Sequence, residues 1–259
     1  MKAFLSHLTT HPRLTRTALA TSLLYLHLHR AYSHTSYAQH NPKLTLKQWY
    51  SHQTAYWDRQ AASIDGVLGG YGVVHQRDVE GSRGFLEKLK VASDCKPMGT
   101  GRALDCGAGI GRVTKELLLP NFDTIDLIEP SKIQLDQAKL NFHNNTKVAT
   151  YYQMGLQDFK YEHSYDCIWV QWVLCYLTDE DMVRFLIESK GRLMEGGVIV
   201  VKENNSEERP VYDGDDNSVA RTREAFERLF ERAGLTIVGH EYQRGFPEEL
   251  MRVSMWALK

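Results

Sequence analysis

Three glycines at alternating positions follow directly on a short apolar stretch, and this arrangement limits the folds that the chain can adopt. The stretch 102–106 predicts a buried strand, and Gly107, Gly109 and Gly111 form the turn after it. Without a β-carbon, these residues let the backbone turn tightly and let a ligand lie against the main chain. The segment 112–119 is predicted to be a helix that stops before a proline. The sequence therefore predicts a strand–turn–helix unit with a ligand site at its turn.

Strands and helices continue to alternate along the rest of the chain. Further strands are expected over residues 124–128, 149–154, 166–172, 198–201, 235–243 and 253–258. Helices are expected over residues 43–59, 79–89, 131–141, 179–194 and 218–233. Helices between strands indicate βαβ units and a parallel sheet, whereas the turn at 245–247 joins the last two strands without a helix. We predict an α/β, Rossmann-like fold with seven strands, one of them antiparallel, and an N-terminal helical extension.

Composition narrows the class of protein. The 259 residues, 42% of them hydrophobic, suit one globular domain with a full core. A formal net charge of −1 gives no general basic field for nucleic acid. The four cysteines show no metal-ligand spacing, so we predict no metal site and reduced, buried thiols. Such thiols are typical of a reducing compartment.

The N-terminal segment differs from the rest of the chain. No Asp or Glu precedes Asp58, whereas Lys, Arg, His, Ser and Thr are frequent there. The apolar stretch 18–28 is too short and too polar to span a bilayer, so no membrane insertion is expected. A basic, hydroxyl-rich, acid-free start resembles an organelle transit peptide, and a disordered extension is equally compatible. We predict a disordered or targeting extension over 1–42 and a single domain over 43–259.

The spacing of the glycines indicates which ligand the turn receives. A dinucleotide fingerprint would place its third glycine one residue later and a pyrophosphate on the helix N-terminus. Here Arg112 follows at once, and a guanidinium pairs well with a carboxylate. S-adenosylmethionine carries a carboxylate and no phosphate, so the turn favours it over NAD.

Residues after the second and third predicted strands extend the same site. Glu129 ends the second strand, where a carboxylate can accept hydrogen bonds from both ribose hydroxyls. Pro130 and Ser131 follow, and Ser131 is predicted to cap the next helix. Leu156 and Gln157 can hold an adenine by apolar contact and an amide hydrogen bond. A solvated acid and an ordinary turn are the alternatives.

The fourth and fifth predicted strands end in polar or aromatic residues. Gln171 and Trp172 interrupt an apolar run, and Asn204 follows the fifth strand. A neutral amide such as Asn204 can orient an amine without fixing it as a cation. The segment 204–216 is rich in Asp and Glu and would attract a basic peptide, although a solvated surface loop has the same composition.

Several of these segments together resemble a known family. The segments 64–72, 103–112, 155–159, 168–172 and 177–179 are similar to the α-N-terminal protein methyltransferases, over about 49–259. That resemblance implies the class I methyltransferase fold, S-adenosylmethionine as cofactor and S-adenosylhomocysteine as product. It implies substrates with an Xaa-Pro-Lys or Xaa-Pro-Arg N-terminus, whose third residue is basic, and a location in cytoplasm and nucleus. The acid-free extension leaves a mitochondrial or other organelle location open.

The resemblance also implies roles for individual residues. The residues assigned to the cofactor are Trp57, Gly107, Gly109, Arg112, Glu129, Pro130, Ser131, Leu156, Gln157 and Gln171. Asn204 and Asp216 are assigned to orient the α-amine and help to deprotonate it. The residues assigned to the peptide are Trp172 as a wall for its proline, Leu68, Gly69 and Gly70 as a lid, and Asp213, Ser218 and Tyr176.

Three positions depart from the family pattern. Tyr176 stands where relatives have a histidine implicated in proton handling, which leaves the general base open. Met251 replaces a tyrosine that contacts substrate, and Glu203 replaces an aspartate. Two other functions keep the same fold, namely a methyltransferase acting on a small molecule and a binding protein without catalysis.

Overall fold

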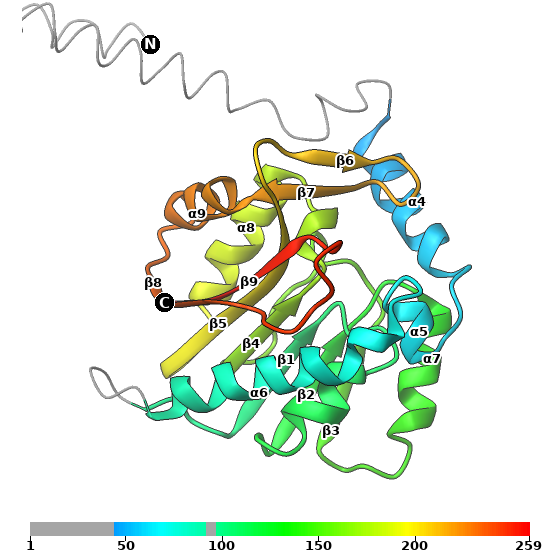
Figure 1. The fold of residues 1–259 in the computed structure, drawn as a ribbon. Helices are drawn as coiled ribbons and strands as arrows, with labels where there is room; N and C mark the ends of the chain where they lie inside the picture. The colour runs from blue at the N-terminus through cyan, green and yellow to red at the C-terminus, as the bar shows by residue number, and fades with distance from the viewer. Residues whose placement is uncertain (1–43, 92–96) are drawn as a thin grey trace, which may run out of the picture. The chain divides into compact units, whose positions relative to one another are not determined.

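The computed structural model describes residues 44–91 and 97–259 (Figure 1). The predicted extension over residues 1–42 lies outside the described residues. Within the described ranges, no helix is both long enough and apolar enough to cross a membrane. The site described below lies wholly within the compact unit Lys43–Lys259.

Seven strands form the sheet that the sequence predicted. They are β1 (Arg102–Cys106), β2 (Thr124–Ile128), β3 (Val148–Tyr152), β4 (Tyr165–Gln171), β5 (Leu193–Ser206), β8 (Ile237–Tyr242) and β9 (Arg252–Leu258). Their order is β3-β2-β1-β4-β5-β9-β8. Neighbours from β3 to β5 are parallel, and β9 is antiparallel to both β5 and β8. The α/β fold with one reversed strand is therefore confirmed.

Two further strands bring the total to nine, so the predicted count of seven was too low. β6 (Val211–Asp213) and β7 (Ser218–Thr222) form a hairpin, and β7 pairs with the last residues of β5. The helix predicted from Ser218 begins only after Thr222, as α9 (Arg223–Arg232). The Thr222 side chain accepts a hydrogen bond from the Ala225 N–H, and this cap starts the helix there.

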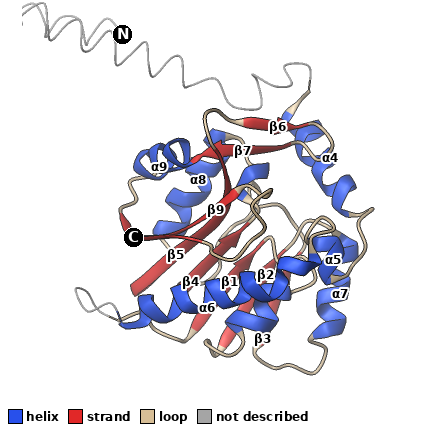
Figure 2. Ribbon diagram, viewed as in Figure 1, coloured by secondary structure: helices blue, strands red, loops and turns tan. Residues whose placement is uncertain are grey.

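Helices cover both faces of the sheet (Figure 2). α6 (His75–Val91) and α7 (Lys132–Asn141) pack on one face, together with the π-helical turn η2 (Thr114–Leu118). α8 (Asp179–Lys190) and α9 pack on the other face. In β4, Cys167 and Trp169 pack in the core on the face covered by α6 and α7, while Ile168 and Val170 pack in the core on the face covered by α8 and α9. Burial on both faces explains why residues 167–170 of this strand are all apolar rather than alternating.

Four short elements lie beside the carboxyl ends of the strands (Figure 1). They are α4 (Leu46–Trp57), α5 (Ile64–Val67), and the 3₁₀ turns η1 (Gly72–Val74) and η3 (Leu174–Tyr176). Thr45 and Gln48 form a capping box that starts α4. These elements close over the edge of the sheet where an open α/β fold binds its ligands.

The observed start of α9 predicts different stabilities for two similar substitutions. Thr222→Ala should lower the free energy of unfolding by about 1 kcal/mol, because it removes the cap of α9. Ser218→Ala is the matched control and should change it by less than about 0.5 kcal/mol. Urea unfolding followed by circular dichroism measures both, and a larger loss for Ser218→Ala would place the helix start at the wrong residue.

Candidate functional site

The glycine turn after β1 adopts backbone angles that other residues rarely accept. Gly107, Gly109 and Gly111 have φ values of 72°, 54° and 79°, in the left-handed region. A β-carbon on Gly107 would also lie 2.8 Å from Cβ of Val173. The Gly107 N–H donates to the carbonyl oxygen of Ile128 at 2.9 Å, which ties the turn to the end of β2. Backbone geometry and close packing thus both require glycine at 107.

Glu129 links the glycine turn to the start of α7. Its Oε2 accepts from the Gly109 N–H at 2.9 Å, and its Oε1 accepts from the Ser131 N–H at 2.7 Å. Each carboxylate oxygen keeps capacity for another donor, as a pair of ribose hydroxyls requires. Burial raises the pKa of Glu129 to about 7. The Ser131 hydroxyl donates to Asp58 at 2.6 Å, which connects this corner to the end of α4.

A pocket opens beside the glycine turn and Glu129. It is lined by Tyr50, Gln53, Thr54, Trp57, Gly107, Ile128, Pro130, Gly155, Leu156, Gln157, Val173, Tyr176 and Leu177. The sequence had assigned Trp57, Gly107, Pro130, Leu156 and Gln157 to the cofactor, and the structure brings these five residues together. Its mostly apolar walls with a few polar groups suit an adenine ring.

Helix α4 supplies more of this pocket than the sequence had indicated. Tyr50, Gln53, Thr54 and Trp57 all line it, but only Trp57 was assigned. The four residues are spaced i, i+3, i+4 and i+7, so they share one face of the helix. That spacing was the signal that could have identified them.

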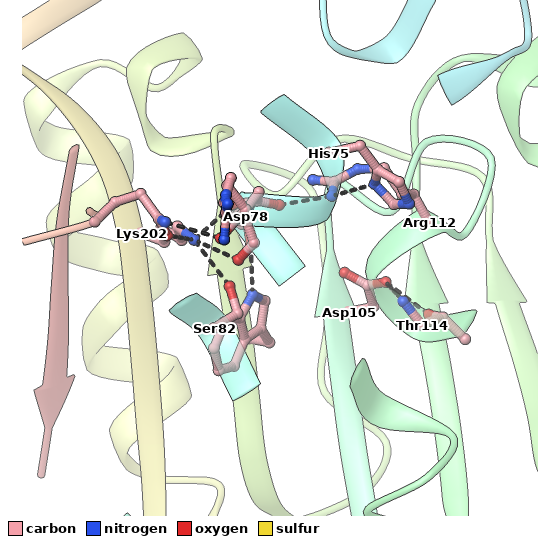
Figure 3. A network of polar contacts seen from close by, with 11 residues as sticks. His75, Asp78, Ser82, Asp105, Arg112, Thr114 and Lys202 are labelled. Carbon is pink, nitrogen blue, oxygen red and sulfur yellow. Dashed lines mark hydrogen bonds and ion pairs between the residues drawn. The ribbon is translucent and has the colours of Figure 1, made fainter. Parts of the chain in front are cut away.

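Arg112 and Gln171 meet at a residue that the sequence analysis had missed. Asp78 of α6 accepts from Arg112 Nη1 at 2.6 Å, and its two oxygens accept from Gln171 Nε2 at 2.9 and 3.0 Å. Lys202 Nζ forms an ion pair with the same carboxylate at 2.5 Å. Figure 3 shows Arg112 and Lys202 on opposite sides of Asp78. Burial acts to raise the pKa of Asp78, but Lys202 and Arg112 outweigh it and hold that pKa below its usual value.

Trp172 turns the chain away from the end of β4. Its φ is 53°, which is unfavourable for a bulky residue and marks a constrained position. Its N–H donates to the carbonyl oxygen of Lys202 at 2.9 Å, and Glu203 accepts from the N–H groups of the next two residues. The indole ring lies 5.7 Å from the Arg112 guanidinium. The N–H of the indole ring, at Nε1, is buried and has no hydrogen-bond partner among the described residues, so it is available as a donor.

The residues assigned to catalysis lie at the mouth of the site. Asp216, in the turn between β6 and β7, accepts from the Tyr176 hydroxyl at 2.8 Å and from the Ser218 N–H at 2.9 Å. Burial and nearby Cys175 and Asp216 raise the pKa of Tyr176 well above its usual value. Asp213, the last residue of β6, and Asp215 are exposed beside Asp216, and we call Asp213, Asp215 and Asp216 together the acidic turn. Asn204 is exposed on β5.

Helix α4 joins the pocket to the acidic turn. Trp49 Nε1 and Gln53 Nε2 both donate to the carbonyl oxygen of Tyr176, each at 2.9 Å. Gln53 Nε2 also donates to the carbonyl oxygen of Asn217 at 3.0 Å. The rings of Trp57 and Tyr176 meet edge to face, with centroids 6.2 Å apart. Pocket and acidic turn are therefore parts of one structure.

The glycine loop after α5 lies close to the glycine turn. A β-carbon on Gly109 would lie 3.3 Å from Cγ1 of Val67, so the two loops touch. Gly69 and Gly70 are exposed, with φ values of 60° and 87°. Leu68, which the sequence grouped with them as a lid, is buried.

Comparisons with known proteins agree with this geometry. Residues 45–259 match the family described as AdoMet dependent proline di-methyltransferase. The chain is 43% identical over 215 residues to "Alpha N-terminal protein methyltransferase 1" of Dictyostelium discoideum, covering 82% of this chain and 80% of that protein. It is 42% identical over 215 residues to "N-terminal Xaa-Pro-Lys N-methyltransferase 1" of Homo sapiens, covering 82% and 96%.

A solved structure shows the same fold. It is a SAM-dependent methyltransferase of Leishmania major, 38% identical, with a TM-score of 0.77 over 82% of this chain and 84% of that one. The glycine turn, the buried Glu129 and the strand order all fit a bound nucleoside with a carboxylate and no phosphate. The chain therefore belongs to the AdoMet-dependent proline di-methyltransferase family, and S-adenosylmethionine is its methyl donor.

Proposed function

We propose that this enzyme transfers methyl groups from S-adenosylmethionine to the α-amino group of protein N-termini that begin Xaa-Pro-Lys or Xaa-Pro-Arg. The relatives named above carry that activity in their names. The observation that carries the proposal is the carboxylate of Asp216, held by Tyr176 beside the pocket. A fixed carboxylate next to a methyl donor suits an amine substrate, which arrives as a cation.

On the donor side, the chain's own residues provide binding and orientation. Glu129 accepts hydrogen bonds from the ribose hydroxyls, and Leu156 and Gln157 hold the adenine. Arg112 and Gln171, both hydrogen-bonded to Asp78, would hold the amino-acid end of the donor. S-adenosylmethionine supplies an electrophilic methyl group on a positively charged sulfur.

On the substrate side, the chain holds the amine and removes one proton. An α-amino group has an ordinary pKa of about 7.7–8.0, so a sizeable fraction is neutral near pH 7. Asp216 binds the ammonium form and accepts its proton, and Asn204 orients the lone pair. A nitrogen–carbon bond then forms as the sulfur–carbon bond breaks. The electron pair of that broken bond stays on sulfur, and the proton leaves through Asp216 to water.

The hydrogen bond between Tyr176 and Asp216 supports different roles for the two residues. Because the pKa of Tyr176 is raised well above its usual value, its hydroxyl stays protonated at neutral pH and donates to Asp216. Tyr176 therefore orients Asp216, and Asp216 is the proton acceptor. The base is then Asp216, and Tyr176, which stands where the family pattern has a histidine, only orients it.

The acidic turn supports selectivity for a basic peptide. Asp213 and Asp215 are exposed beside Asp216, and all three acids raise the pKa of Tyr56 on α4, after burial as the main cause. Tyr56 packs edge to face against Trp57, which lines the pocket. A substrate with Lys or Arg at its third residue would be attracted there, and an acidic one repelled. The ring of Trp172 offers an apolar wall for proline.

The assignment of Asp216 as proton acceptor predicts unequal effects of two substitutions in one turn. Asp216→Asn should lower kcat on an Xaa-Pro-Lys peptide by about 10²–10⁴-fold, the range expected for loss of a general base. Asp215→Asn removes the same charge nearby and should change kcat by less than about twofold. Steady-state assays with mass detection compare them. Wild-type turnover in Asp216→Asn, with the fold intact, would reject the assignment.

The acidic turn predicts a salt-sensitive preference among peptides. At low ionic strength, KM should be about tenfold lower for an Xaa-Pro-Lys peptide than for the matched Xaa-Pro-Glu peptide. The difference should shrink at about 1 M salt, because the Debye length falls to about 3 Å. Asp213→Asn should reduce the preference. Transfer to a panel of small-molecule amines with no transfer to either peptide would favour the small-molecule alternative.

The buried Glu129 predicts that donor binding depends on pH. Ribose hydroxyls donate to the charged carboxylate, so binding lowers the pKa of Glu129 from about 7. Affinity for S-adenosylhomocysteine should therefore be highest above that pKa. Its Kd should rise by up to about tenfold for each pH unit below it.

Calorimetry between about pH 6 and about pH 8 measures this dependence. Glu129→Gln should bind more weakly, and its Kd should be nearly flat across the same range. An equal slope in Glu129→Gln and in the wild type would mean that another group titrates.

A further inference from the structure

We propose that Asp78 is a positioning residue for the methyl donor. Its carboxylate holds Arg112 and Gln171 in the orientation that receives the amino-acid end of the donor, and Lys202 fixes that carboxylate in place. The inference rests on the proposed donor-binding roles of Arg112 and Gln171. It adds Asp78, which contacts these two residues, and Lys202, which contacts Asp78.

Asp78 has the contacts that such a role requires. The side chain is 1% exposed on α6, and its two oxygens receive Arg112 Nη1, Gln171 Nε2 and Lys202 Nζ. Hydrogen bonds between charged groups are short and strong, and a guanidinium held at one nitrogen loses most of its freedom. The carboxylate therefore sets where the remaining N–H groups of Arg112 point.

Gln171 is held in a single amide orientation. Its Oε1 accepts from Trp169 Nε1 at 2.9 Å, so its Nε2 must face the opposite way. That nitrogen donates to Asp78. Without a negative charge at residue 78, the hydrogen bond from Gln171 Nε2 would weaken and this amide would be held less firmly.

Lys202 is buried, and its ammonium group contacts Asp78 rather than solvent. The side chain is 0% exposed, and Nζ donates to the Asp78 main-chain oxygen at 3.1 Å, Ser82 Oγ at 2.9 Å and Gln243 Oε1 at 2.7 Å. A β-carbon on Gly81 would lie 2.2 Å from Gln243 Oε1. Glycine is unfavourable inside a helix, and here it makes room for this contact.

The same lysine connects the donor and substrate sides. Its carbonyl oxygen accepts from the Trp172 N–H, and Asn204 lies two residues further on the same face of β5. Asp78 thus ties together Arg112 on the turn after β1, Gln171 at the end of β4 and the strand that carries Asn204. A shift at Asp78 would move the donor's binding residues relative to those of the amine.

Binding of two related ligands distinguishes a positioning role of Asp78 from a purely structural one. S-adenosylhomocysteine and 5′-methylthioadenosine share the nucleoside and the thioether sulfur, but only the first has the amino-acid end. Asp78→Asn should raise the Kd of S-adenosylhomocysteine by about tenfold to a hundredfold, the effect of losing a charged hydrogen bond. The Kd of 5′-methylthioadenosine should change by less than about threefold. A purely structural role would weaken both ligands equally.

A double variant protects the test against misfolding. Asp78→Asn alone leaves Lys202 buried without its charge partner, which is costly, whereas Asp78→Asn with Lys202→Met removes both charges. Thermal unfolding should return toward that of the wild type in the double variant. The Kd of 5′-methylthioadenosine divided by that of S-adenosylhomocysteine should stay below its wild-type value, because Arg112 still lacks the Asp78 carboxylate. Recovery of both stability and the ratio would overturn the proposal.

Arg112→Met shows which claim fails if the result is negative. If that variant leaves the ratio of Kd values unchanged, Arg112 does not bind the amino-acid end and the donor assignment itself is wrong. If Arg112→Met lowers the ratio and neither Asp78 variant does, the donor assignment stands and the positioning role of Asp78 is rejected.

Discussion

The two hydrogen bonds that α4 donates to the main-chain oxygen of Tyr176 hold the functional site together. A buried carbonyl oxygen without partners is costly, so Trp49 and Gln53 are needed where they lie. The same helix face lines the pocket, and the same tyrosine donates to Asp216. Donor pocket and acidic turn come from distant parts of the chain, and α4 is the element that joins them.

Buried charge is the second feature of the site. Asp78 and Lys202 are almost fully buried, and Glu129 is nearly so. Burial of such groups is unfavourable unless each finds partners, and here each oxygen of Asp78 and of Glu129 receives at least one N–H. Their stabilising contribution is offset by desolvation. What they provide is fixed direction, which a methyl transfer over about 3 Å requires.

The sequence was sufficient to predict seven strands of the sheet and the glycine turn after β1, because both follow from local patterns. Strand periodicity and the alternation with helices predicted the order of elements, and the glycine spacing placed the turn after β1. The hairpin β6–β7 was missed because its strands are short and partly exposed, and they are held by pairing with each other and with the last residues of β5. Asp78 was missed because it lies within a helix, and its partners are 34, 93 and 124 residues away along the chain.

A structure of the enzyme with S-adenosylhomocysteine and an Xaa-Pro-Lys hexapeptide would test the central claim most directly. We expect the ribose hydroxyls to donate to Glu129 and the product's carboxylate to contact Arg112. The peptide's α-amino nitrogen should lie within hydrogen-bond distance of Asp216 and face the thioether sulfur. A peptide bound away from the acidic turn would contradict it. So would an amine that points away from the sulfur while both ligands are fully ordered.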